Sequence, residues 1–296
     1  MHRAASRVLR ILVFVLVGAS VAVDAAAQAI SASFASKGAD IHYTVDGDGP
    51  PVILVHGFTG SGARHFGGTG VLQAIVNAGF RAAAIDCRGH GMSSKPTDPG
   101  AYGLRMVEDV VGLMDHLRIR RAHIIGYSMG GWIASQVLIS HPERVLTVTL
   151  LGSGWEGEDV RGMNQQMLAL ADGFDRKDAS SLMRGVTSGA GNGPSDADGA
   201  AENADLFARN PPEVLAAMAR GMRPLFDIRG DQLKRVKVPV HALVGENDAP
   251  NLAGARRMSD VVPGMTVKII PGATHQSSVR PSAPLIVEFL TQHREG

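Results

Sequence analysis

Cysteine is nearly absent from this 296-residue sequence, in which Cys87 stands alone. A single cysteine excludes an intrachain disulfide, so the stability of the fold has to come from its hydrophobic core. Aromatic residues make up only 5% of the chain and charged residues only 19%, whereas 45% of the residues are hydrophobic. This composition excludes a disordered chain and predicts a globular protein with one domain that carries an insertion, or two domains at most.

The sequence also has no large excess of basic or of acidic residues. The 29 basic and 28 acidic residues leave a formal charge of +1, without long runs of one sign. This balance gives no indication of nucleic acid or of an acidic membrane surface as a partner, and the sequence does not define an oligomeric state.

One apolar run stands out, from Ile11 to Val23, with arginines before it and small residues after it. This order is typical of a secretory signal peptide, so we predict that residues 1–29 are a signal, cleaved after Ala27 or Ala29, and that the protein is secreted or periplasmic. The alternative is a membrane anchor, but the run has 13 residues and a spanning helix needs about 20. We expect no stable membrane association after cleavage. The arginines are Arg3, Arg7 and Arg10, and the small residues are Ala25, Ala26, Ala27 and Ala29.

Short apolar runs bounded by turn residues predict six strands that are buried on both faces. Segments with apolar residues at helical spacing lie between several of them. This alternation predicts the α/β class, with a doubly wound, mostly parallel sheet and helices on both faces. The predicted buried strands are 52–55, 82–85, 123–125, 145–151, 240–244 and 267–270, with a weakly alternating strand at 41–45 after a polar lead-in; the predicted helices are 107–117, one from near Trp132 to before Pro142, and 285–290.

One stretch breaks the alternation and predicts a helical cap at 155–235, between core segments 30–154 and 236–296. It has helical patterns and no convincing strand, and its middle, Gly185 to Ala200, is rich in loop-forming residues. Its methionines have two interpretations, ordinary core packing or an adaptable apolar lining of a binding pocket. These methionines are Met163, Met167, Met183, Met218 and Met222.

The strongest local motif is Gly126-Tyr127-Ser128-Met129-Gly130, which directly follows one predicted strand and directly precedes a predicted helix. A sharp turn from strand to helix forces its central residue into a strained conformation and leaves no room for side chains at Gly126 and Gly130. The hydroxyl of Ser128 is then exposed at the carboxyl edge of the sheet, next to a helix N-terminus that favours developing negative charge. We interpret Ser128 as a nucleophile.

A serine hydroxyl needs a base, and His275 is the best placed of the 11 histidines because it follows the last predicted strand. Asp248 follows the strand before it, which gives the chain order Ser, Asp, His. A carboxylate there would hold the imidazole in its productive tautomer and stabilise the protonated ring. Glu246 remains an alternative acid, as do two residues after the strand that ends at Leu151. These two are Glu156 and Asp159.

Catalysis by Ser128 also needs amide donors for an oxyanion. We predict the backbone N–H groups of Met129 and of Phe58, where Gly57 allows close approach of the backbone. His56 could be a second base but is interpreted as a structural part of this loop. Asp86 to Ser93 fits no common metal or phosphate motif and is interpreted as a tight structural turn, with Asp86 and Arg88 bonded to neighbouring backbone.

These motifs occur in the order found in the α/β-hydrolase fold family, which the chain resembles from about Asp40 to Leu290. The resemblance implies an eight-stranded sheet, a lid after the sixth strand, and hydrolysis through an acyl-enzyme without a cofactor or metal. Epoxide hydrolases and haloalkane dehalogenases on this fold have an aspartate at the elbow, and Ser128 argues against both. We expect a small acyl substrate, first a carboxylic ester or lactone. Carbon–carbon bond or amide hydrolysis, acyl transfer, and a catalytically silent ligand-binding protein remain alternatives.

Overall fold

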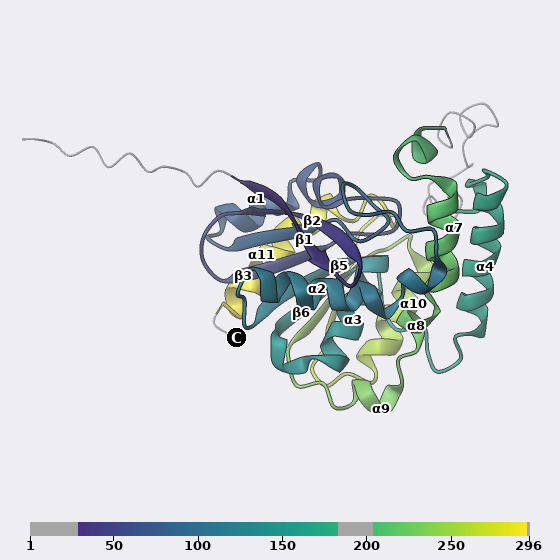
Figure 1. Ribbon diagram of the computed structural model, residues 1–296. Helices are drawn as coiled ribbons and strands as arrows, with labels where there is room; N and C mark the ends of the chain where they lie inside the picture. The colour runs from purple at the N-terminus through teal and green to yellow at the C-terminus, as the bar shows by residue number, and fades with distance from the viewer. Residues whose placement is uncertain (1–28, 183–203, 295–296) are drawn as a thin grey trace, which may run out of the picture.

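The computed structural model describes residues 29–182 and 204–294. Its centre is an eight-stranded sheet with the strand order β1-β2-β4-β3-β5-β6-β7-β8 (Figure 1). β2 pairs antiparallel with β1 and β4, and all the other pairs are parallel. The predicted mostly parallel α/β sheet is therefore confirmed. The strands are β1 (Ile30–Ser36), β2 (Ala39–Asp46), β3 (Pro51–Val55), β4 (Arg81–Ile85), β5 (Ala122–Tyr127), β6 (Val145–Leu151), β7 (Val240–Gly245) and β8 (Thr266–Ile270).

Helices cover both faces of this sheet because its inner strands are apolar on both sides. In β3, Val52 and Leu54 pack in the core under α1 and α11, whereas Ile53 and Val55 pack in the core under α2 and α3. Alternate side chains of one strand thus pack against the two helix layers on opposite faces of the sheet. The helices of the core are α1 (Val71–Asn77), α2 (Leu104–His116), α3 (Met129–Ser140), α10 (Ala249–Ser259) and α11 (Ala283–Gln292), with short turns η1 (Ala63–Gly67), η2 (Pro99–Ala101), η3 (Pro142–Arg144) and η4 (Arg280–Ser282).

The two edges of the sheet differ from the prediction. The expected polar lead-in contains β1, in which Phe34 is buried and stacks on His116 with ring centroids 5.3 Å apart. At the other edge, the prediction that 267–270 is buried on both faces is wrong. Only Ile270 of β8 is buried, and Ile269 is 41% exposed, because an edge strand has one neighbouring strand and incomplete helix cover.

The segment between β6 and β7 is helical, and its described residues contain no strand. Helices α4 and α7 lie side by side at one end of the sheet (Figure 1). Trp155 Nε1 donates to the carbonyl of Ile228 at 2.7 Å, which ties the start of this segment to its end. Loop 185–200 and Met183 lie outside the described residues. The named helices are α4 (Arg161–Asp175), α7 (Pro212–Gly221), α8 (Arg223–Phe226) and α9 (Gly230–Leu233).

The predicted signal peptide also lies outside the described residues, apart from Ala29. Among the described residues, no helix combines the length and apolar character that crossing a membrane requires.

The turn after β4 is held by buried charges. Arg88 donates to both carboxylate oxygens of Asp109 on α2, at 2.7 and 2.6 Å, and to the carbonyl of Ala101 at 2.7 Å. Asp86 accepts hydrogen bonds from the backbone N–H groups of Gly62 at 2.9 Å and Met92 at 3.0 Å. Both residues thus support the turn, and Arg88 does so through an acid that the sequence motif did not contain.

Asp109→Asn is expected to lower the free energy of unfolding by about 3–5 kcal/mol, because it leaves the Arg88 guanidinium buried without a counter-charge. The side chains of Arg88 and Asp109 are each 1% exposed. Urea unfolding of the wild type and the variant measures this change. Glu288→Gln is the matched control, since its ion pair with Lys268 is half exposed and is worth about 1 kcal/mol or less. Equal effects of the two changes would contradict the expectation.

Candidate active site

Ser128 lies in the turn between β5 and α3 and has a strained backbone, with φ of +53° and ψ of −117°. The turn is tight enough to require glycine on both sides. A Cβ atom at Gly126 would be 2.1 Å from the carbonyl oxygen of Gly130, and one at Gly130 would be 2.0 Å from that of Val55. Strain of this kind persists where the surrounding structure enforces it, and it is common at functional sites.

The structure brings the three predicted catalytic residues together. Ser128 Oγ lies 2.9 Å from His275 Nε2, and His275 Nδ1 lies 2.7 Å from Asp248 Oδ2. Asp248 follows β7 and His275 follows β8, so parallel strands deliver both to the edge where β5 ends in Ser128. With the proton on Nδ1, the ring donates to Asp248 and Nε2 accepts from the serine hydroxyl. The contacts have the geometry that general-base activation of Ser128 requires.

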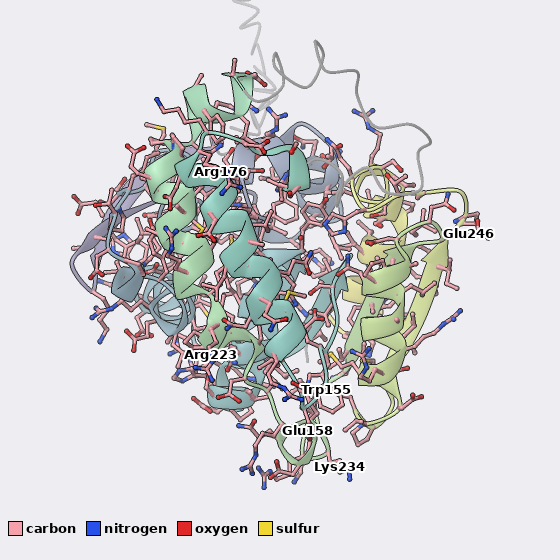
Figure 2. The ribbon with its side chains drawn as sticks, turned by 90° about the vertical axis from the view of Figure 1, so that its right-hand side faces the viewer. Trp155, Glu158, Arg176, Arg223, Lys234 and Glu246 are labelled. Atoms are coloured by element: carbon pink, nitrogen blue, oxygen red, sulfur yellow. The ribbon has the colours of Figure 1, made fainter. Side chains whose placement is uncertain are left out.

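The alternative acids lie elsewhere. Glu246 is exposed and accepts a hydrogen bond from the backbone N–H of Gly272 at 2.8 Å, and Figure 2 shows it at the outer edge of the molecule. Asp159 is exposed and bonded to Arg161, whose guanidinium lowers the pKa of this carboxyl to about 2. Glu156 borders the pocket at Ser128 but hydrogen-bonds to Trp132 and not to His275. Among these four acids, Asp248 alone hydrogen-bonds to His275.

Residues beyond the predicted set hold His275 and Asp248 in place. Asn251 Nδ2 donates to Asp248 Oδ1 at 2.8 Å, so both oxygens of that carboxylate have a partner. The ring of Tyr127 stacks on the imidazole with centroids 5.1 Å apart, and its hydroxyl donates to the His275 carbonyl at 3.3 Å. Gly152 adopts φ of +52°, and a Cβ atom there would be 2.9 Å from His275 Nδ1. The spacing of Asn251 three residues after Asp248, in the first turn of α10, could have indicated its role.

Most backbone N–H groups near Phe58 in the loop after β3 have acceptors. The N–H of Gly57 donates to His65 Nδ1 at 3.1 Å, that of Thr59 donates to His90 Nε2 at 2.9 Å, and that of Gly60 donates to the Gly57 carbonyl at 3.2 Å. The N–H of Phe58 has no acceptor among the described residues, and neither does that of Met129. These are the two donors predicted for an oxyanion.

His56 is a structural residue. Its Nε2 accepts from the N–H of Cys87 at 2.9 Å, which leaves the proton on Nδ1 to be donated to the Gly57 carbonyl at 2.7 Å. The ring is fully buried, and burial lowers its pKa. It therefore stays neutral and links the loop after β3 to the turn after β4, as its interpretation as loop structure predicted.

Three neutral histidines thus shape the loop that presents Phe58, and two of them, His65 and His90, were not expected to have this role. Burial lowers the pKa of His65 to about 3, and it lowers that of His90 well below the ordinary value. Both rings use an unprotonated nitrogen to accept from backbone, so protonation would break those hydrogen bonds.

We expect the melting temperature to fall as the pH drops from about 6.5 toward 3. The folded-state pKa of these rings lies below the unfolded value of about 6.5, so the unfolded chain binds more protons in this range and acid favours it. His65→Asn cannot be protonated, so its deficit in melting temperature relative to the wild type should be largest near neutral pH and shrink in acid. His141→Asn is the control, because His141 is a partly exposed surface histidine outside this loop. Parallel curves for His65→Asn and the wild type would contradict the expectation.

A cavity of about 210 Å³ opens beside Ser128 and His275, between α3, α4 and α10. Met163 and Met167 of α4 line it, and Met167, Met218 and Met222 are buried in the core. Both interpretations of the cap methionines therefore apply, and Met167 combines the two. No group of histidine, cysteine or acidic side chains within the described residues is arranged to hold a metal ion.

Comparison with known proteins identifies the family of the fold. The family model of the alpha/beta hydrolase fold matches residues 50–232. An epoxide hydrolase from Caballeronia sordidicola is 36% identical over 115 residues, which are 38% of this chain and only 34% of that protein. A putative 2-succinyl-6-hydroxy-2,4-cyclohexadiene-1-carboxylate synthase from Bacillus subtilis (strain 168) is 28% identical over 85% of this chain and 95% of its own length. A solved structure of Est816, described as an N-acyl homoserine lactone degrading enzyme, is 26% identical with a TM-score of 0.70, over 88% of this chain and 99% of that chain.

The chain belongs to the α/β-hydrolase fold family. Relatives named as hydrolases support its assignment as an enzyme of that family, although the chain spans only 34% and 41% of the length of two of them. The resemblance drawn from the elbow and the order of the motifs along the chain is confirmed.

Proposed function

We propose that this protein is a serine hydrolase that cleaves a carboxylic ester or a lactone through an acyl-enzyme on Ser128. The observation that carries the proposal is the chain of contacts from Asp248 to His275 to Ser128, at 2.7 and 2.9 Å, which ends at the wall of a cavity. An isolated serine hydroxyl is a poor nucleophile, and this arrangement provides the base that activates it.

In the proposed reaction, Ser128 Oγ attacks the acyl carbon while His275 Nε2 takes its proton. The carbonyl oxygen becomes an oxyanion, for which the free N–H groups of Phe58 and Met129 are the donors. The intermediate collapses, the bond to the leaving oxygen breaks, and His275 returns the proton to that alcohol. A water molecule, deprotonated by His275, then attacks the acyl-enzyme and releases the acid and Ser128. With a lactone, the alcohol and the acid are one product molecule.

The residues also discriminate among the activities of the relatives. Epoxide opening on this fold uses a carboxylate nucleophile at the elbow, and this chain has Ser128 there, so the similarity to epoxide hydrolases does not extend to their nucleophile. The lactone activity named for Est816 needs an acyl carbonyl, which a serine nucleophile attacks directly. This favours an ester or lactone over an epoxide.

A substrate panel tests the proposal. We expect hydrolysis of p-nitrophenyl esters with short acyl chains and of γ-lactones, which fit a cavity of about 210 Å³. Epoxides, a diketone and an anilide belong in the same panel. Turnover of the diketone with no ester or lactone hydrolysed would replace the proposal by carbon–carbon bond hydrolysis, and binding without any turnover would favour a ligand-binding protein.

We also propose that the protein acts outside the cytoplasm, after removal of residues 1–29. The support is the order of arginines, apolar run and alanines in the sequence. The intact mass of exported protein is the test, and a mass that retains residue 1 would count against it.

A further inference from the structure

We propose that Glu156 is a specificity-determining residue, and that it selects esters or lactones with an N–H donor close to the scissile carbonyl. This inference rests on the proposed function of Ser128 and names the substrate class of the same site. It begins from a carboxyl group that catalysis by Asp248, His275 and Ser128 does not use.

Glu156 lies in the wall of the cavity that Ser128 and His275 also line. The same wall contains the indole of Trp132, the thioethers of Met163 and Met167, and the polar side chain of Gln166. A carboxyl group in such a setting loses hydration and needs polar partners in return. Glu156 is only partly exposed, so its carboxyl group has lost part of its hydration and gains from a polar partner in the cavity.

One oxygen of Glu156 has a partner and the other is available. Oε1 accepts from Trp132 Nε1 at 3.1 Å. Oε2 has no hydrogen bond to any described residue, and no described cation lies within ion-pair distance of it. Trp132 itself packs edge-on against Phe226, with ring centroids 4.8 Å apart, so the indole that anchors Glu156 is held from behind. The carboxyl group is thus positioned with one acceptor left for a molecule in the cavity.

The electrostatics agree with this geometry. Burial raises the pKa of Glu156, while the hydrogen bond from Trp132 and the charge of Arg257 oppose part of that rise. Arg257 donates to the Trp155 carbonyl at 2.6 Å and is not bonded to Glu156. A substrate N–H would supply the missing hydrogen bond, and a hydrogen bond to a charged group is stronger than one between neutral groups. A substrate without that donor would bury the carboxyl group and leave it unpaired.

The prediction is a selectivity between two substrates of the same shape. N-acetylalanine methyl ester has an N–H beside the scissile ester, and O-acetyllactate methyl ester has an oxygen in its place. Methanol release measures cleavage of the same bond in both. We expect the wild type to prefer the N–H substrate by about tenfold or more in kcat/KM, because a site built to hydrogen-bond a donor rejects the analogue that lacks it.

Glu156→Gln keeps the size of the side chain but replaces one acceptor by a donor. We expect it to lower the kcat/KM ratio of the two substrates by about tenfold or more. The matched control is Glu158→Gln, two residues away. Glu158 is exposed and accepts from the N–H of Gly230 at 2.9 Å, and Figure 2 shows it near Lys234. Its ratio should equal that of the wild type.

Two outcomes overturn the proposal for Glu156 and leave the proposed function intact. One is a wild type that hydrolyses both esters without preference. The other is a Glu156→Gln variant with both rates reduced equally, which would mean that Glu156 only supports the cavity wall through Trp132. If the wild type cleaves neither of these esters nor any ester or lactone of the substrate panel, the proposed function fails as well.

Discussion

Ser128→Ala is expected to lower kcat/KM for an ester substrate by about 10⁴ or more, because loss of the nucleophile removes the covalent route altogether. The residual rate would come from the oxyanion donors and from substrate binding alone. Intact-mass measurement after treatment with a fluorophosphonate probe provides a second readout. The wild type should gain a single adduct and the variant none, since the probe reacts with an activated serine and His275 is positioned to activate only Ser128.

Ser259→Ala is the matched control, because Ser259 lies on α10 and its hydroxyl donates to the Arg256 carbonyl at 2.8 Å. It should retain both the rate and the adduct. Retention of esterase turnover within about tenfold in Ser128→Ala would mean that another group carries the reaction. Absence of an adduct on the wild type would mean that His275 does not activate Ser128. A ligand-binding role would then be favoured over hydrolysis.

Much of the candidate site could be predicted because parallel strands carry their following loops to one edge of the sheet. Ser128, Asp248 and His275 each lie in the segment that follows a predicted apolar strand, so their meeting follows from local patterns and topology. Asn251 has only a weak local signal, its position three residues after Asp248. His65 has none, because its role depends on a contact with the Gly57 amide that the folded loop creates.

The dependence on packing between distant segments also explains why the sequence did not predict the burial of the two edge strands correctly. An apolar run predicts a strand, but it does not show whether helices cover that strand on both faces. Ile269 is apolar and 41% exposed because β8 has no strand beyond it. Phe34 shows the reverse case, in which one aromatic residue among serines and alanines is enough to anchor β1 against His116.

Asp248→Asn is the second change with a large expected effect, a loss of about 10⁴ in kcat with the fold retained. The carboxylate accepts the Nδ1 proton of His275 at 2.7 Å and thereby leaves Nε2 free to take the proton of Ser128. The amide of an asparagine can donate to Nδ1 instead, which would place the ring proton on Nε2, facing Ser128. The histidine could then no longer act as base, although every distance in the site would be nearly unchanged.

The rate measured against pH separates this effect from simple damage to the site. Loss of the negative charge beside His275 should also weaken the stabilisation of the protonated ring, so the Asn variant should stay slow at every pH at which the wild type is active. Glu246→Gln and Asp159→Asn remove the same charge at the two exposed acids that sequence reasoning could not exclude, and both should keep nearly the wild-type rate. The assignment would be contradicted if Asp248→Asn were nearly as active as the wild type and one of these two controls lost most of its activity. The carboxylate removed in that control would then be the orienting acid, and the contact between Asp248 and His275 would not be the one that directs the proton.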